Sequence, residues 1–239
     1  VNHPLIYRDY AIYQSDFGDG GSKLELRLWP LTGGRLEPVD IKGEVGGALK
    51  VAGPAGPLGL ELTEFRLFNL LPEPGARPGD RKFRNFGPSV GFKARDATGE
   101  AREYLNYMAP VQLEGRWFCV SGVRARSGAE FVYLHIPVDA NNSPERFLRF
   151  NARLRDEEGL RALLARAPTP TENPDFQHDL NQVRLNLVEL FIQGGFAAVT
   201  ERARAVVPPD RLQEATKLYL EILRDTLAEV FIEVLRAEG

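Results

Sequence analysis

Apolar and polar residues alternate with a period of two through much of the first 139 residues. In the segment 23–29, Leu24, Leu26 and Leu28 fall on one face, and charged residues fall on the other. This alternation is typical of a strand with one buried face. Similar short apolar runs predict strands at residues 5–13, 58–62, 90–95, 111–113, 116–124 and 131–138.

Residues that favour turns separate the predicted strands. Such residues gather at 18–21, 32–34, 73–75, 78–80, 98–99 and 127–128. Several short strands joined by turns of this length are typical of an antiparallel sandwich or an open barrel. The stretch 53–59, which is rich in glycine and proline, is interpreted as a further loop.

Beyond Asp139 the apolar residues recur at helical spacing. Asn142 or Ser143 can cap the first helix, and Gly194 with Gly195 is expected to stop the second. The predicted helices cover residues 144–166, 174–193, 196–207 and 210–237. The fold class that follows is α+β: an antiparallel β-sandwich or open barrel over residues 1–139, and then a helical C-terminal region over residues 140–239. We expect the helical region to pack on the β-rich domain or to extend from it.

Three of the predicted helices carry apolar stripes that we expect to be buried. The stripes of the first two are Phe147, Phe150 and Leu154, and then Phe176, Leu180, Val183, Leu187, Leu190 and Phe191. The last helix has a broad apolar face made by Leu212, Ala215, Tyr219, Ile222, Leu223, Thr226, Val230, Phe231 and Val234. This face is expected to pack on the sheet or on the second helix, and the alternative is a surface for a partner protein.

Composition and charge narrow the classes of function. Of the 239 residues, 43% are hydrophobic and 26% are charged, and the formal net charge is −3. These values are ordinary for a globular protein, and the negative charge argues against a nucleic-acid partner. No apolar run approaches the ~18–20 residues that a membrane-spanning helix needs. The single cysteine, Cys119, excludes an internal disulfide, and its apolar neighbours predict a buried, unreactive thiol.

The motifs of common catalytic and metal sites are missing from the sequence. It contains no Walker loop, no dinucleotide fingerprint and no His-Glu-x-x-His. Of the three histidines, His3, His135 and His178, we interpret His135 as a structural histidine in a strand; a ligand or proton-transfer role is the alternative. We therefore predict no catalytic residue and no metal site, and the chain is not expected to be an enzyme.

One stretch, residues 77–102, has a local excess of positive charge. It holds seven basic residues against three acidic ones and is interleaved with Phe83, Phe86 and Phe92. Clustered cationic groups beside aromatic rings can bind carboxylates, phosphates or planar groups. We therefore predict an anion- or partner-binding patch made by Arg77, Arg81, Lys82 and Arg84. The alternative is a solvated loop whose charges balance nearby acids.

Two sets of short stretches carry a resemblance to a known family. The first set comprises residues 1–5, 12–15 and 17–21, and the second comprises residues 87–90, 95–104, 106–111, 121–124 and 136–139. The most specific part is the Asn-Tyr-Met-x-Pro-Val run at 106–111, which follows Arg-Asp-x-x-Gly at 95–99. In these residues the chain resembles the extracytoplasmic domain of the ResB (CcsB) family of cytochrome c biogenesis proteins.

The resemblance implies an inner-membrane protein whose large loop, represented by this chain, faces the periplasm. Together with a ResC (CcsA) partner, such proteins deliver haem and present apocytochrome c for thioether attachment. The haem-ligating histidines of the family lie chiefly in membrane spans and in the partner, and this sequence contains no such span. The resemblance therefore implies no haem ligand in this chain, and haem is expected to be handled by the full complex.

On this basis we expect a non-enzymatic scaffold or apocytochrome-docking domain at the periplasmic face of the inner membrane. Its partner-facing corner is predicted to comprise Arg95, Asp96, Asn106, Tyr107 and Met108. For the first two residues, an ion pair within a hairpin is the alternative. The alternative function is a soluble β-sandwich that binds carbohydrate or another small ligand, or a hydrolase that uses surface acids. Ligand binding of that kind needs a concave pocket lined by Trp or Tyr.

Overall fold

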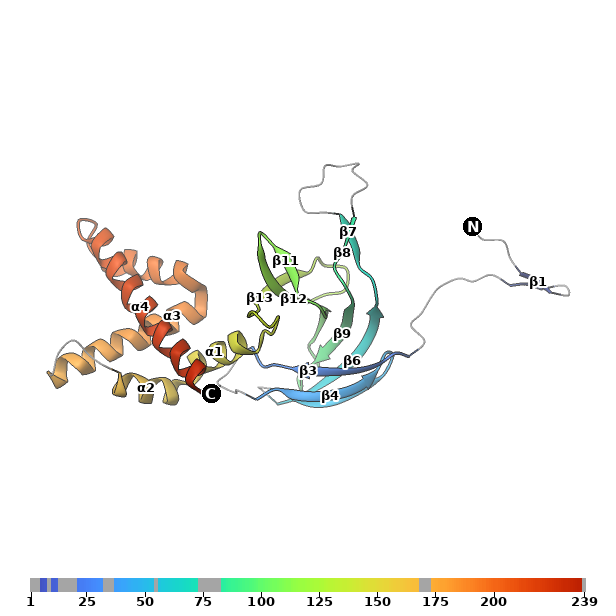
Figure 1. The fold of residues 1–239 in the computed structure, drawn as a ribbon, viewed down its shortest axis with the longest axis horizontal. Helices are drawn as coiled ribbons and strands as arrows, with labels where there is room; N and C mark the ends of the chain where they lie inside the picture. The colour runs from blue at the N-terminus through green and yellow to red at the C-terminus, as the bar shows by residue number, and fades with distance from the viewer. Residues whose placement is uncertain are drawn as a thin grey trace. The chain divides into compact units, whose positions relative to one another are not determined.

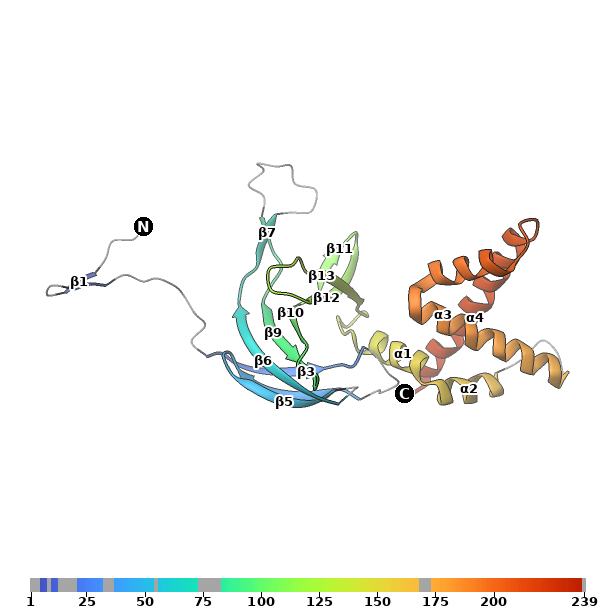
Figure 2. The same cartoon turned by 180° about the vertical axis from the view of Figure 1, so that it is seen from behind.

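The computed structural model describes residues 5–7, 10–12, 21–31, 37–53, 56–72, 83–167 and 173–237. The chain forms two compact units. The first comprises Val1–Arg27, Asp40–Leu113 and Cys119–His135, and the second comprises Leu28–Val39, Glu114–Phe118 and Ile136–Gly239. The first is called the strand unit below, because it holds most of the described strands, and the second is called the helical unit (Figure 1, Figure 2).

The described elements follow the change of period along the sequence. The strands are β1 (Leu5–Tyr7), β2 (Tyr10–Ile12), β3 (Lys23–Leu28), β4 (Val39–Glu44), β5 (Ala48–Gly53), β6 (Gly56–Arg66), β7 (Leu70–Pro72), β8 (Phe83–Asn85), β9 (Ser89–Arg95), β10 (Ala101–Tyr107), β11 (Val111–Leu113), β12 (Arg116–Arg124) and β13 (Val132–Pro137). The helices are α1 (Glu145–Arg155), α2 (Glu157–Arg166), α3 (Pro174–Val206) and α4 (Leu212–Ala237). The predicted α+β class is confirmed, whereas the division into domains at 1–139 and 140–239 stays a prediction.

The strand unit is built on one large antiparallel sheet. Its strands follow the order β11-β12-β10-β9-β6-β5, and β13 pairs with β12. In the β9–β10 hairpin Phe92 lies opposite Tyr104, and their stacked rings have centroids 4.9 Å apart. A register shift between Leu62 and Glu64 interrupts the pairing of β6 with β9, as a bulge does. The sheet stays open, in agreement with the predicted architecture.

Alternation along the strands places one face in a small core. Leu24 of β3, Leu62 of β6 and Val90 of β9 are buried together, and Leu26, Val45, Leu49, Phe65 and Phe92 pack on them. Gly43 of β4 allows this close approach, because a Cβ there would lie 2.6 Å from Leu62 Cδ1. The buried face predicted from the segment 23–29 is therefore correct.

Two expectations for the strands are wrong. Where one strand was predicted over residues 5–13, the described residues 5–7 and 10–12 form two short paired strands, β1 and β2. Within the stretch 53–59, where a loop was predicted, Gly53 of β5 pairs with Gly56 of β6 and residues 56–59 belong to β6; residues 54 and 55 lie outside the described residues. The sequence pattern also fails to reveal β10. Both of its faces are half-buried, so no clear alternation of polar and apolar residues marks it.

The first predicted helix is in fact two helices. Asp156 ends α1 and caps α2, since its carboxylate accepts a hydrogen bond from the Gly159 N–H at 3.1 Å. A side chain that binds the free N–H groups of a helix start competes with continuation of the preceding helix. At the beginning of α1 the Ser143 hydroxyl accepts a hydrogen bond from the Glu145 N–H at 3.2 Å. Ser143 therefore supplies the predicted capping interaction.

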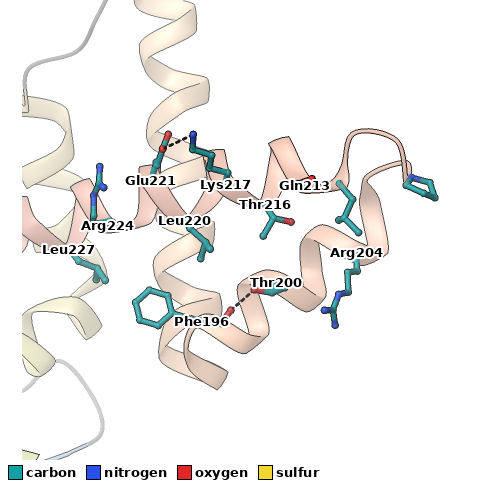
Figure 3. Close-up of a pocket in the computed structure, with 12 residues that line it drawn as sticks. Phe196, Thr200, Arg204, Gln213, Thr216, Lys217, Leu220, Glu221, Arg224 and Leu227 are labelled. Atoms are coloured by element: carbon teal, nitrogen blue, oxygen red, sulfur yellow. Dashed lines mark hydrogen bonds and ion pairs between the residues drawn. The ribbon is translucent and has the colours of Figure 1, made fainter.

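Gly194 and Gly195 interrupt α3 as predicted. Gly195 has φ 65° and ψ −157°, a backbone conformation that essentially only glycine adopts. Beyond the interruption, the last segment of α3 runs beside α4 (Figure 3). None of the described helices combines the length and the apolar character that crossing a membrane requires.

The core of the helical unit forms where α4 packs against α3 and α1. Its buried residues are Leu154, Leu160, Leu164, Leu187, Val188, Val199, Leu223 and Val230. The expectation that α4 packs on the second helix is confirmed. All three predicted stripes are only partly right, because Phe147, Phe176, Val183 and Phe231 are exposed whereas Leu148 and Val188 are buried. Leu154 and Leu187 of the predicted stripes do lie in the core, and Phe150, Leu190 and Phe191 pack against it.

Candidate functional site

The structure does not bring the five residues of the predicted corner together. In the register of β9 and β10, Ala101 lies opposite Arg95, and Tyr107 lies opposite Ser89. These two pairs are six positions apart along β10, which corresponds to about 20 Å of strand. Arg95 and Asp96 therefore lie at one end of the hairpin, and residues 106–108 lie at the other.

At the first end, Arg95 and Asp96 stabilise the turn that joins β9 to β10. Arg95 Nη1 donates a hydrogen bond to the Gly99 carbonyl oxygen at 2.9 Å. The Asp96 carboxylate accepts hydrogen bonds from the Thr98 hydroxyl at 2.7 Å and from the Glu100 N–H at 3.1 Å. The bond from Thr98 lowers the pKa of Asp96 below its usual value. The ion pair considered for Arg95 and Asp96 is therefore wrong, because each side chain binds the turn instead.

At the second end, residues 106–108 differ in how much of their side-chain surface is available to a partner. The Asn106 side-chain oxygen accepts a hydrogen bond from the Ser121 hydroxyl at 2.6 Å. The Tyr107 ring lies edge-on to Phe86, with centroids 6.3 Å apart, and burial raises the pKa of its hydroxyl. Met108 donates only its backbone N–H, to Pro88, and its side chain is 45% exposed. Of the three, Met108 presents the most apolar surface to solvent.

Arg84 is the one residue of the predicted basic patch that the structure describes; Arg77, Arg81 and Lys82 lie outside the described residues. The Arg84 guanidinium stands over the Phe86 ring, 5.5 Å from its centroid. Its Nη1 donates a long hydrogen bond of 3.5 Å to the Gln112 carbonyl oxygen. The described part of the chain contains no carboxylate paired with it, so its positive charge is not neutralised there.

A group of polar side chains that sequence reasoning missed holds the base of the β7–β8 hairpin. Asn69 is buried, and its side-chain amide donates hydrogen bonds to the Gly87 carbonyl at 2.8 Å and to the Ser89 hydroxyl at 3.0 Å. The Asn85 side-chain oxygen accepts from the N–H groups of Asn69 at 3.1 Å and Gly87 at 3.0 Å. An asparagine inside the apolar run at residues 67–71 was the available signal, because buried polar side chains need partners.

Around this base, the β7–β8 hairpin exposes an unusual amount of apolar surface. Five large apolar residues here have exposed fractions between 41% and 66%: Leu67, Phe68, Leu70, Leu71 and Phe83. We call this set of residues the apolar hairpin. Figure 1 shows β7 and β8 projecting beyond β6 and β9. Large contiguous apolar surfaces on a soluble unit mark sites of interaction with proteins or membranes.

A second apolar surface lies on β13. Val132, Tyr133 and Leu134 are 68%, 40% and 43% exposed. Among the described strands β13 pairs with β12 alone, so it forms an edge of the large sheet. Gly122 of β12 leaves room for the Tyr133 ring, because a Cβ there would lie 2.8 Å from it. An apolar edge strand is a ready template for pairing with an extended chain.

The two residues singled out for reactivity have ordinary surroundings. Cys119, predicted to be buried and unreactive, is half-buried, and burial raises the pKa of its thiol, which favours the unreactive protonated form. His135 of β13 is exposed. Within the described ranges no group of three or more His, Cys, Asp or Glu side chains could hold a metal ion.

The helical unit has a long groove between the last segment of α3 and α4 (Figure 3). Its volume is about 840 Å³, and Phe196, Leu220 and Leu227 contribute to its apolar lining. Lys217 and Glu221 on its rim face one another with 3.9 Å between Nζ and Oε1. Neither Trp nor Tyr lines this groove, so it lacks the aromatic platforms expected of a carbohydrate site.

A smaller cleft of about 440 Å³ in the same unit contains Trp29, Arg149 and Arg153. The guanidinium of Arg153 in this cleft is already paired with carboxylates of the protein. Arg153 donates two hydrogen bonds to the Glu233 carboxylate, at 2.8 and 2.9 Å, and also pairs with Asp156. These carboxylates raise the pKa of Arg153. The cleft therefore offers a ligand an aromatic wall but no free charge at Arg153.

Comparison with known proteins decides the family. The model of the ResB-like family matches residues 1–220. The chain belongs to the ResB-like family. No curated protein and no solved structure gave a match. Family membership assigns this ResB-like protein a role in cytochrome c biogenesis, and the family is known as a biogenesis component rather than as an enzyme.

Proposed function

We propose that this ResB-like chain is the periplasmic portion of a membrane-anchored protein and serves as a scaffold that holds apocytochrome c. In this proposal a ResC (CcsA)-type partner works beside it at the inner membrane. Haem is handled by the full complex, and this chain contributes position rather than bond-making chemistry. Thioether formation requires reduced thiols held near haem vinyl groups, and holding one reactant in place is a large part of that task.

The observation that carries the proposal is the apolar edge strand β13. An extended peptide adds to such an edge through main-chain hydrogen bonds, and side chains on alternate positions supply specificity. Val132 and Leu134 point to one face of the strand, and Tyr133 points to the other. A peptide strand along β13 would cover apolar side chains on both faces. Edge strands that avoid pairing usually carry lysine or proline; residues 132–136 of β13 have neither, and Pro137 stands only at its end.

A binding measurement tests the proposal. The probe is a fluorescent peptide with a Cys-x-x-Cys-His motif, the signature of c-type haem attachment, kept reduced. We expect the chain to raise its anisotropy saturably, and the V132T/L134T variant to bind it at least tenfold more weakly. Threonine keeps the strand propensity and removes apolar surface. The matched control is L70T/L71T, which removes two exposed leucines from β7 and should leave peptide affinity unchanged.

Equal peptide affinity for the wild type and V132T/L134T would contradict the proposal that the peptide binds along β13. Loss of affinity in both double variants would show that the measurement reports general apolar binding. Circular dichroism of each variant establishes that the fold is intact.

The alternative of a small-ligand-binding protein would use the cleft beside Trp29. Family membership favours the biogenesis role over this alternative. A carbohydrate or small-acid screen monitored by Trp fluorescence separates the two, because Trp29 lies in that cleft and would report its occupancy.

A further inference from the structure

We propose that the apolar hairpin is a membrane-contact site that inserts into the interfacial region of a bilayer carrying anionic phospholipids. This surface is separate from β13, and the inference does not depend on apocytochrome docking. Two properties of the hairpin support it: the distribution of its apolar side chains over both faces, and the positive charge of the sequence that contains it.

The apolar side chains lie on both faces of the two-stranded ribbon. In the register of β7 and β8, Leu70 lies opposite Asn85, Leu71 opposite Arg84 and Pro72 opposite Phe83. Since side chains alternate between faces, Leu70, Pro72 and Phe83 share one face and Leu71 occupies the other. Leu70 is 65% exposed, Leu71 41% and Phe83 58%. A protein groove that covered one face would leave the other in water, whereas a bilayer interface surrounds both.

The sequence that contains the hairpin carries positive charge, which suits an anionic surface. Residues 66–84 include five basic and two acidic residues, a formal net charge of +3, in a chain whose net charge is −3; of the basic residues, Arg77, Arg81 and Lys82 lie outside the described residues. At the base of the hairpin Arg66 pairs with Glu64 at 3.0 Å, but Arg84 has no carboxylate partner among the described residues. Basic residues beside an inserted apolar segment are attracted by the negative potential of anionic lipid headgroups.

Insertion of the ribbon is expected to be shallow, as for peripheral segments that enter the boundary between headgroups and acyl chains by roughly 5–10 Å. Deeper insertion is unfavourable, because the outer edges of a two-stranded ribbon carry unpaired backbone groups that hydrocarbon does not satisfy. The hydrogen bonds of Asn69 and Asn85 hold the base of the ribbon in a defined conformation.

Vesicle co-sedimentation tests the inference with the whole chain. The probes are vesicles of phosphatidylglycerol mixed with phosphatidylcholine, and vesicles of phosphatidylcholine alone. We expect the chain to sediment with the first far more than with the second, and 0.5 M salt to weaken this binding. The L70S/L71S variant should bind at least tenfold more weakly, and R84Q about fivefold more weakly, as expected for one basic residue near the surface.

A matched control removes two exposed apolar residues from the helical unit. F176S/L218S changes residues that are 51% and 53% exposed and should leave vesicle binding unchanged. Absence of binding to either vesicle, or an equal loss in L70S/L71S and F176S/L218S, would overturn the inference. Concentration-dependent self-association that L70S/L71S abolishes, without vesicle binding, would assign the hairpin to a second copy of the chain. Thermal unfolding confirms that each variant is folded.

Discussion

Arg184 is a buried cation in the core of the helical unit. It is 5% exposed and sits one turn before the buried residues Leu187 and Val188. Its Nε donates a hydrogen bond to the Thr226 hydroxyl at 2.9 Å, and its Nη2 forms an ion pair with Glu229. A buried charge is tolerated only while its partners remain, because a lone charge in the interior loses its hydration without compensation.

The first prediction concerns this pair. E229M removes the carboxylate and leaves Arg184 buried without its counter-charge, so the free energy of unfolding should fall by about 3 kcal/mol. The double variant R184M/E229M leaves no buried charge and should cost less than E229M alone. Urea denaturation measures both values.

The matched control on the same helix is E221M. Glu221 pairs with Lys217 on the surface, and an exposed pair of this kind contributes at most about 1 kcal/mol. A cost for E229M no larger than that for E221M would contradict the assignment of a buried ion pair.

Glu103 is held between two cations on the large sheet. Arg124 Nε donates a hydrogen bond to it at 2.7 Å, and Lys93 Nζ lies 3.5 Å away. The bond from Arg124 lowers the pKa of Glu103 below its usual value of 4.5. A carboxylate whose pKa is lower in the folded state stabilises the fold above its unfolded pKa, and this contribution is lost as the pH falls.

The second prediction is that stability declines as the pH falls below about 4.5, and that E103Q removes part of this decline. At neutral pH the variant should be less stable than the wild type, and the difference should shrink towards pH 3. Urea midpoints at pH 7 and pH 3 measure this change. A difference between the two proteins that is independent of pH would contradict it.

At the scale of elements, Gly195 sets the path of α3. Its positive φ redirects the chain, so that Phe196 and Thr200 come to line the groove against α4 (Figure 3). No atom of the described residues lies within 4 Å of the position where a Cβ would stand, so the constraint comes from the backbone and not from crowding.

The third prediction follows from this backbone constraint. G195A should lower the free energy of unfolding by about 1–3 kcal/mol, because alanine is strained in this conformation. Q193A, on the exposed side of the same helix, should change it by no more than about 0.5 kcal/mol. Equal stability of G195A and the wild type would mean that the interruption tolerates a side chain.

Interruptions of helices illustrate what local sequence can reveal at this scale. A pair of glycines is visible in the sequence as a helix stop, and α3 is interrupted there. The break at Asp156 is not visible, since Asp also occurs on helix surfaces and the apolar period continues across it. It becomes a cap because Arg153 pairs with its carboxylate while that carboxylate accepts from Gly159.

At the scale of the whole molecule, the strand unit offers two separate apolar surfaces, β13 and the apolar hairpin. The fourth prediction is that they act independently. Affinity for the Cys-x-x-Cys-His peptide should change by less than twofold when vesicles containing phosphatidylglycerol are present. The L70S/L71S variant should still bind the peptide but bind vesicles weakly. The V132T/L134T variant should still bind vesicles but bind the peptide weakly.

Competition between peptide and vesicles in this assay would mean that one surface serves both ligands. Fluorescence anisotropy with and without vesicles distinguishes independent from competitive binding.

For the candidate site, sequence reasoning identified residues better than it identified their arrangement. Arg95, Asp96 and residues 106–108 do lie on one hairpin, but β10 places them at its opposite ends. The partner role of these residues stays a prediction. Asn69, Leu70 and Leu71 did not stand out, and no element was predicted over the run that contains them.

The order and type of most elements followed from the sequence by itself, because periods of two and of 3.6 residues reflect the local geometry of strands and helices. The family also followed from it, through short runs of residues in a characteristic order. Only the tertiary structure decided which of these apolar residues are covered. Leu164 and Leu71 are equally apolar in the sequence, yet the first is fully buried and the second is 41% exposed. Burial depends on which distant segments pack against a residue, and no local pattern contains that information.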